Sequence, residues 1–197
     1  MKKDKSKNSD QEDLRLIQKV KKGNIRAFEK IVLKYQKQLY VLVRKMVLNH
    51  DDTNDIVQDT FVKVFSNLKT FDEQKVFYPW LHRILINTTL NQIEKKRRYQ
   101  ETYIQAGNQD EYFSPNGNPL KAVIQSEYEN RIALALGKLS DEQRIVFILK
   151  TSEELSYQEI SEQLNISLGT VMSRLSRARE KLKKLLSPYW ELKNKQD

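Results

Sequence analysis

The fold is decided near the end of the chain, by residues 156–186, which read SYQEISEQLNISLGTVMSRLSRAREKLKKLL. Ser156 followed by Glu159 forms a capping box, in which a hydroxyl and a carboxylate each accept a hydrogen bond from the other residue's backbone amide. Leu155 and Ile160 take the positions of a hydrophobic staple around this box. The pattern predicts that a helix begins directly after Ser156.

A second helix is predicted after a tight turn. The first helix, 157–164, ends at Asn165, a residue that tolerates a left-handed backbone. Ile166 fills the turn, and Ser167 can cap a helix over 168–186. Apolar side chains fall on one arc of this second helix, and mostly polar ones fall on the opposite arc. The inner arc carries Val171, Leu175, Ala178, Leu182, Leu185 and Leu186, and the outer arc carries Met172, Ser173, Ser176, Arg177, Lys181 and Lys184.

A helix, a tight turn and a second helix with a basic outer face are typical of the helix-turn-helix that binds DNA. The first half of the second helix would enter the major groove. Gly169 and Thr170 at its start would allow the backbone to approach phosphates. The alternative interpretation is an amphipathic surface helix whose charges only face water. The two caps, the turn and the basic face together favour DNA binding.

The composition agrees with a helical protein that binds a polyanion. Lys and Arg number 35 against 26 Asp and Glu, which gives a net charge of +9 and a pI of about 9.5. Such a charge favours nucleic acid without identifying it. The chain has only five glycines and four prolines, and this scarcity of helix breakers favours long helices over a turn-rich β fold.

The sequence predicts no metal, cofactor, membrane segment or catalytic centre. There is no cysteine, and the two histidines, His50 and His82, have no carboxylates at helical spacing. No apolar run approaches a span of about 20 residues, and no apolar core follows the basic N-terminus, as a signal peptide requires. Without a membrane span or a signal peptide, we expect a cytoplasmic protein. Because a Gly-rich phosphate loop and a nucleophile with its base are also absent, we expect that it is not an enzyme.

The periodicity divides the chain into two all-α domains. Helical patterns cover 11–22, 24–49, 51–68 and 80–98. They follow a polar segment, 1–10, that is expected to be disordered, and they form a first domain over 11–98. Residues 99–126 contain Gly, Pro and Asn without a period and are predicted to be a flexible linker. The second domain, 127–187, contains the helix-turn-helix and precedes a tail over 188–197.

Five stretches of the chain occur together in the order and spacing of a known family. They are DDTNDIVQDTF (51–61), WLHRILIN (80–87), LSDEQR (139–144), SYQEIS (156–161) and GTVMSRLSRAREKL (169–182). On these stretches the chain resembles the extracytoplasmic-function sigma factors, the small members of the sigma-70 family of bacterial RNA polymerase. The resemblance covers about 13–98 and 136–186. It implies a factor that binds core RNA polymerase, recognises promoter DNA and promotes strand opening.

The resemblance implies a polymerase-binding surface on the acidic helix. Asp52, Asp55, Gln58 and Asp59 would dock on the clamp helices of the largest subunit. A polar edge of this kind can meet basic groups and orient the association. The alternative is a solvated helix N-terminus, where the helix dipole favours anions. The polymerase flap and an anti-sigma protein are further partners that the resemblance suggests.

The resemblance also implies a reader of the minus-ten element in the first domain. Phe71 and Asp72, with Asn87 on the following helix, would hold a base outside the stack, and Lys95, Lys96, Arg97 and Arg98 would hold phosphates. Holding a flipped base must offset an unstacking cost of a few kcal/mol, so aromatic or polar walls are needed. Phe71, Phe77, Tyr78 and Trp80 could supply apolar surface, although most of these rings, Trp80 above all, are expected in the core.

The second domain would read the minus-thirty-five element as duplex DNA. The residues implied are Gly169, Thr170, Met172, Ser173, Arg174, Ser176, Arg177 and Lys181. Ser173, Ser176 and Arg177 are the candidates for base edges, and a bidentate contact from Arg177 to guanine would be worth about 1–3 kcal/mol. Arg174 and Lys181 are better placed for phosphates or packing. Met172 departs from the family, which often has a basic residue there.

A stand-alone helix-turn-helix regulator is the alternative function. In that hypothesis the first domain, 11–98, would sense a signal. The hypothesis leaves the linker, the acidic helix and the aromatic loop without a common explanation, whereas a sigma factor uses all three.

Overall fold

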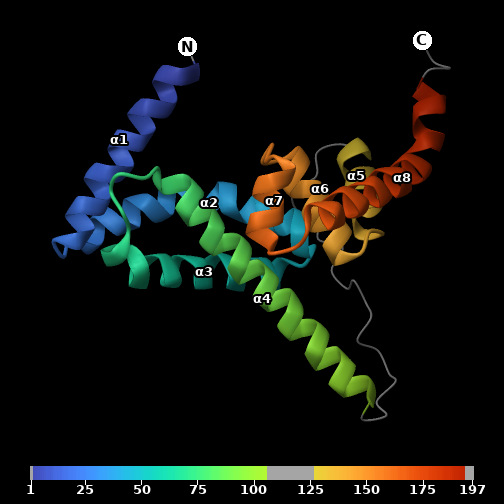
Figure 1. Cartoon of the computed structure of the whole chain (residues 1–197), viewed down its shortest axis with the longest axis horizontal. Helices are drawn as coiled ribbons and strands as arrows, with labels where there is room; N and C mark the ends of the chain where they lie inside the picture. The colour runs from blue at the N-terminus through green and yellow to red at the C-terminus, as the bar shows by residue number, and fades with distance from the viewer. Residues whose placement is uncertain (1, 106–126, 194–197) are drawn as a thin grey trace. The chain divides into compact units, whose positions relative to one another are not determined.

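The computed structural model describes residues 2–105 and 127–193, and within them it contains helices and no strand (Figure 1). The elements are α1 (Lys2–Lys21), α2 (Ile25–Val47), α3 (His50–Asn67), η1 (Leu68–Thr70), α4 (Phe77–Gln105), α5 (Glu127–Gly137), α6 (Asp141–Thr151), α7 (Tyr157–Leu164) and α8 (Leu168–Lys193). The prediction of an all-α fold is confirmed. Most of the predicted linker, 106–126, and the end of the predicted tail, 194–197, lie outside the described residues.

Three helices extend further than the sequence predicted. α1 begins at Lys2 rather than near Gln11, where the polar segment was expected to end. α4 runs from Phe77 to Gln105, although periodicity predicted a helix only over 80–98 and a linker from 99. α8 continues to Lys193, beyond its predicted end at 186 and into the predicted tail. None of the added segments contains glycine. Pro79 lies in the first turn of α4, where its missing N–H is not required for a helical hydrogen bond.

The first of two compact units comprises 1–41 and 51–98. Gly23, at φ 91°, follows the end of α1 in a left-handed backbone, which glycine adopts without a steric penalty. α1 is fixed to α2 through Asp13, whose side chain is 1% exposed. This carboxylate accepts hydrogen bonds from the Tyr35 hydroxyl and the Lys34 ammonium, both at 2.5 Å. Burial, followed by the hydrogen bond to Asp13, raises the pKa of Tyr35, so the phenol stays protonated as a donor.

The apolar stripe of α3 is rotated relative to the sequence pattern, which predicts an inner stripe of Val57, Phe61, Val64 and Leu68 with Ile56 and Phe65 beside it. Ile56 and Thr60 are buried with Val64, although the sequence placed Ile56 beside the stripe. Val57, predicted in the stripe, is only half-buried, and Phe65 is 45% exposed. The rotation arises because buried Thr53 and Thr60 belong to the inner face, and threonine does not register as apolar in a hydrophobic pattern. The Thr60 hydroxyl is satisfied by donating to the Ile56 carbonyl at 2.7 Å.

The second unit comprises 42–50 and 99–197. Its described core includes a cluster from α5, the following turn and α8, namely Ala135, Leu136, Leu139, Ala178 and Leu182, against which Ile132, Phe147 and Leu186 pack. Ser140 caps α6 through a capping box with Gln143, which was not among the predicted caps. The Arg144 guanidinium is 5% exposed, donates to the Leu139 carbonyl at 3.2 Å and pairs with Asp141. These contacts fix the start of α6, a helix that packs against α7 and α8.

Candidate polymerase and nucleic-acid interfaces

The acidic edge of α3 points largely to solvent. Asp55, Gln58 and Asp59 are exposed, as a docking surface requires. Asp52 differs, because its carboxylate is 23% exposed and pairs with the Lys96 ammonium of α4 at 2.6 Å. The sequence assigned these two residues to different sites, and the structure brings them together. The pair leaves Asp55, Gln58 and Asp59 as the accessible part of the edge.

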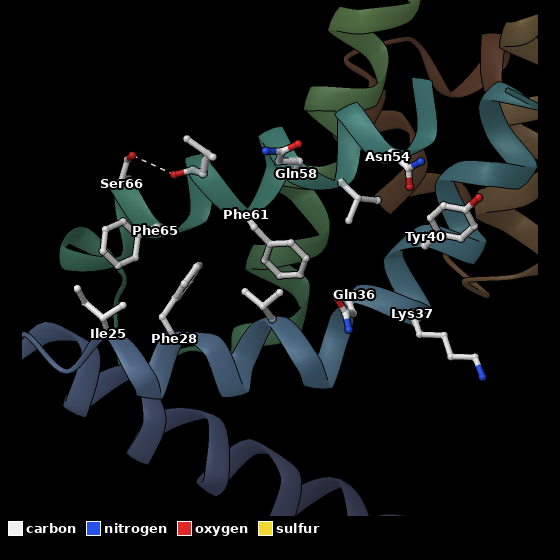
Figure 2. Close-up of a pocket in the computed structure, with 13 residues that line it drawn as sticks. Ile25, Phe28, Gln36, Lys37, Tyr40, Asn54, Gln58, Phe61, Phe65 and Ser66 are labelled. Atoms are coloured by element: carbon white, nitrogen blue, oxygen red, sulfur yellow. Dashed lines mark hydrogen bonds between the residues drawn. The ribbon is translucent and has the colours of Figure 1, made fainter. Parts of the chain in front are cut away.

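An apolar groove of about 940 Å³ lies beside this edge, between α2 and α3 (Figure 2). The side chains that line it are Ile25, Phe28, Val32, Gln36, Lys37, Tyr40, Asn54, Val57, Gln58, Phe61, Val62, Phe65 and Ser66. Figure 2 shows Phe28 from α2 facing Phe61 and Phe65 from α3 across the groove. The Phe28 ring meets those of Phe61 and Phe65 edge-on, at 6.4 and 4.9 Å between centroids.

The groove is apolar at one end and polar at the other. Ile25, Val62 and Phe65 are 71%, 59% and 45% exposed, although all three are large apolar residues. Gln58 belongs both to the groove wall and to the predicted polymerase-binding residues. Sequence reasoning missed the groove, and the available signal was the set of apolar residues on α2 and α3 that did not fit the inner stripes. A surface of this kind fits an amphipathic helix with a polar flank.

The loop between η1 and α4 is held by α1. Lys21 donates to the Phe71 carbonyl at 2.9 Å and pairs with Glu73 at 2.8 Å, and Gln18 donates to Glu73 at 2.9 Å. The hydrogen bonds from Lys21 and then Gln18 lower the pKa of Glu73, so this carboxylate remains ionised and keeps its ion pair with Lys21. Asp72 is exposed at the tip and accepts from the Gln74 amide at 3.0 Å. These bonds, which form a loop clamp, tie the loop to the last turn of α1.

The aromatic side chains of this loop divide between core and surface. Phe71 and Phe77 are 4% and 1% exposed, and their rings pack edge-on at 5.6 Å between centroids. Trp80, expected in the core, is half-buried, and its ring centroid lies 5.0 Å from that of Phe71. Tyr78 is also half-buried, and its hydroxyl accepts from Gln38 at 2.8 Å. The predicted minus-ten residue Phe71 therefore supports the loop from below, and Asp72 is the accessible one.

The outer face of α4 carries an exposed polar row. Asn87, the predicted base contact, is exposed, and so are Arg83, Asn91 and Lys95 at four-residue spacing. Residues four apart are neighbours on a helix surface, so each of these side chains lies beside the next in a row that winds gradually around α4. Arg83 and Asn91 were missed in the sequence, although the spacing itself was the signal. The row connects the loop end of α4 to its basic run.

The basic run on α4 is partly paired within the helix. Arg97 and Arg98 both donate to Glu94, at distances between 2.9 and 3.2 Å. Their hydrogen bonds, that of Arg97 first, lower the pKa of Glu94, so the carboxylate stays charged. Lys95 and Lys96 are exposed, and Lys96 is the partner of Asp52. The predicted phosphate-binding residues thus lie close together at the surface, with carboxylates among them.

The helix-turn-helix has the predicted caps. The Ser156 hydroxyl accepts from the Glu159 amide at 3.2 Å, and the Glu159 carboxylate accepts from the Ser156 amide at 2.7 Å. Asn165 has φ 52° and ψ 48°, the left-handed conformation that turns the chain from α7 into α8. Ser167 then caps α8 by accepting from the Thr170 amide at 3.1 Å. These local bonds set the angle at which α8 leaves the turn.

The outer face of α8 presents the residues predicted to bind DNA. Gly169, Met172, Ser173, Ser176, Arg177 and Lys181 are exposed, whereas Thr170 and Arg174 are half-buried. The Ser173 hydroxyl donates to the Thr170 carbonyl at 3.1 Å, and the Thr170 hydroxyl lies 2.8 Å from that of Ser167. A Cβ added at Gly169 would meet only the Ser167 hydroxyl, at 3.9 Å. Packing within the protein therefore does not explain the glycine.

The described part of the chain contains no helix that is long and apolar enough to cross a membrane. Over the same residues, His, Asp and Glu side chains nowhere gather in threes that could hold a metal ion.

Known families and proteins match both units. Residues 31–99 match the family Sigma-70 region 2, and residues 129–182 match Sigma-70, region 4. Over 177 residues the chain is 37% identical to the ECF RNA polymerase sigma factor SigW of Bacillus subtilis, a match that covers 86% of this chain and 94% of SigW. It is 31% identical over 184 residues to the RNA polymerase sigma-H factor of Pseudomonas aeruginosa, with 90% and 95% covered.

Two solved structures of similar proteins are complexes. CnrH bound to the cytosolic domain of CnrY is 28% identical with a TM-score of 0.59, over 90% of this chain and 98% of that chain. The sigma factor RpoE of Bartonella quintana, bound to the anti-sigma factor NepR, is 27% identical with a TM-score of 0.61, over 81% and 96%.

Proposed function

Because this chain belongs to the extracytoplasmic-function sigma factors of the sigma-70 family, we propose that its α2–α3 groove binds core RNA polymerase, while the surfaces of α4 and α8 read promoter DNA. The protein acts as a sigma factor, which recruits the polymerase, recognises a promoter and promotes strand opening. Whole-length similarity to sigma factors, with 94% of SigW covered, carries this conclusion and disfavours a stand-alone regulator. Sigma factors act by binding, and we propose no catalytic role for this chain.

The α2–α3 groove and the edge of α3 suit one helical partner. An amphipathic helix can bury an apolar stripe on Ile25, Val62 and Phe65, which solvent now reaches. Basic residues beside that stripe would then face Asp55 and Asp59, which are exposed. Apolar contact supplies affinity, and the charges orient the encounter. The family resemblance implies that this partner is the pair of clamp helices of the polymerase. We propose that these helices present such an apolar stripe with basic residues beside it.

The minus-ten element would meet the loop at Asp72 and the polar row on α4. Asn87 can form hydrogen bonds with an exposed base edge, and Lys95 can approach a phosphate. Rigid presentation matters, because a pocket must offset the cost of unstacking a base. The clamp from Lys21 and Glu73 gives the loop that rigidity.

The minus-thirty-five element would meet α8 in the major groove. Arg177 is exposed on its outer face and can contact guanine through two hydrogen bonds. The start of α8 supplies backbone amides to a phosphate. Regulation by an anti-sigma protein is part of the proposal, because RpoE of Bartonella quintana was solved with the anti-sigma factor NepR.

Charge reversal on the edge of α3 tests the docking proposal. The variant Asp59→Arg should lower co-purification with core RNA polymerase at least ten-fold, because a cation would face the basic flank of the partner helix. The matched control is Glu29→Arg, the same charge change at an exposed position of α2 that does not line the groove. Both variants should keep the helical circular dichroism of the parent. Equal binding by Asp59→Arg and the control would refute docking on this edge.

A further inference from the structure

Two large apolar side chains lie exposed in the first two turns of α8. Leu168 is 43% exposed and Met172 is 52% exposed. They are four residues apart, so they lie on the same side of the helix. Single exposed apolar residues are common on proteins, but these two form a continuous strip at the end of the helix that the proposed function places in the major groove.

The polar neighbours of this strip are already bonded within the helix. The Ser173 hydroxyl donates to the Thr170 carbonyl, and the hydroxyls of Thr170 and Ser167 bond to each other. The hydroxyls of Thr170 and Ser173 are therefore already bonded, Gly169 offers no side chain, and the nearby Arg174 is half-buried. The exposed side-chain surface left at the start of α8 is the apolar surface of Leu168 and Met172.

The major groove offers one apolar group, the C5-methyl of thymine. We propose that Leu168 and Met172 read thymine methyl groups in the minus-thirty-five element. This inference rests on the proposed function, since it takes α8 as the helix that enters the groove. Met172 thereby selects the base sequence by apolar contact, whereas the basic residue that the family often has at this position would hold a phosphate.

Met172 and Arg177 are five residues apart on α8, so their side chains point about 140° apart around the helix axis. The thymine read by Met172 is therefore a different base from the guanine read by Arg177.

The test uses the full chain with bacterial core RNA polymerase. Promoters are first selected from a randomised library by run-off transcription, and each thymine of the minus-thirty-five element is then replaced in turn by uracil, which removes only the methyl group. At the position facing Met172 we expect about a four-fold loss of open complexes, equivalent to about 0.8 kcal/mol for one methyl group. Met172→Ala should lose this dependence, and Met172→Leu should retain it.

The matched control is Leu134→Ala, which removes another exposed apolar side chain, 64% exposed, from α5. This variant should show the same four-fold effect of uracil as the parent. The inference alone is overturned if promoters are selected but no thymine shows the effect, or if Met172→Ala keeps it. If the library yields no start site, the proposed function fails, and the inference fails with it.

Discussion

The stability of the first unit should depend on pH through one buried histidine. His82 of α4 is 5% exposed, and burial lowers the pKa of its imidazole from 6.5 to about 4. A lowered pKa means that the folded state prefers the neutral ring. His82 thus contributes stability fully above pH 6.5, and this contribution is lost as the pH falls towards 4.

The size of the effect follows from the two pKa values. Proton linkage with 6.5 unfolded and about 4 folded gives a loss of about 2 kcal/mol in the free energy of unfolding between pH 8 and pH 5. The full difference, reached below pH 4, is about 3 kcal/mol. A loss of this size is a large part of the stability of a small domain.

Urea unfolding of the first unit measures this loss. Trp80 is next to Leu81 and two residues from His82, so its fluorescence reports this unit once Trp190 is replaced by Phe. The midpoint should fall clearly from pH 8 to pH 5 in the parent and much less in His82→Leu, which leaves no titrating ring. His50→Leu, at an exposed position, should behave as the parent does. A pH dependence that is unchanged in His82→Leu would refute the reasoning.

Two further predictions concern α8. Arg177→Ala should lower transcription from the selected promoter by about 5- to 150-fold, the range for one bidentate base contact, while core polymerase binding stays within two-fold. Run-off transcription measures the first quantity and a gel-shift titration the second. Equal losses in both would contradict a base contact. Gly169→Ala should raise the thermal midpoint of the second unit, since alanine favours a helix by up to about 1 kcal/mol over glycine and its Cβ meets only the Ser167 hydroxyl at 3.9 Å. Promoter binding should nevertheless weaken, because the added Cβ lies where a phosphate would approach the backbone. Unchanged binding would show that no phosphate approaches there.

The helix-turn-helix could be predicted from the sequence because its signals are local. Each cap joins residues three apart, as in Ser156 with Glu159 and Ser167 with Thr170. The left-handed turn needs only Asn165, a residue type that tolerates it. Each of these features is decided within a few residues, so no knowledge of the packing was required.

The α2–α3 groove and the loop clamp could not be predicted in this way. Both depend on residues that are far apart in the sequence, such as Phe28 with Phe65, or Lys21 with the Phe71 carbonyl 50 positions away. Apolar residues that leave the inner stripe of one helix look like an irregular pattern until the neighbouring helix is placed. The position of Phe71 in the core has the same origin, because its ring is buried by Phe77 and Trp80.

The ion pairs on α4 suggest why promoter binding should need the polymerase. Glu94 accepts from Arg97 and Arg98, and Asp52 accepts from Lys96, so carboxylates already meet three of the four cations of the basic run. A DNA phosphate must displace or share these carboxylates, which lowers the free energy of binding gained from each phosphate contact. Exposed pairs of this kind exchange easily and are screened by salt. The free chain should therefore bind DNA weakly, whereas a strand already held by the polymerase needs only such an exchange to reach the arginines.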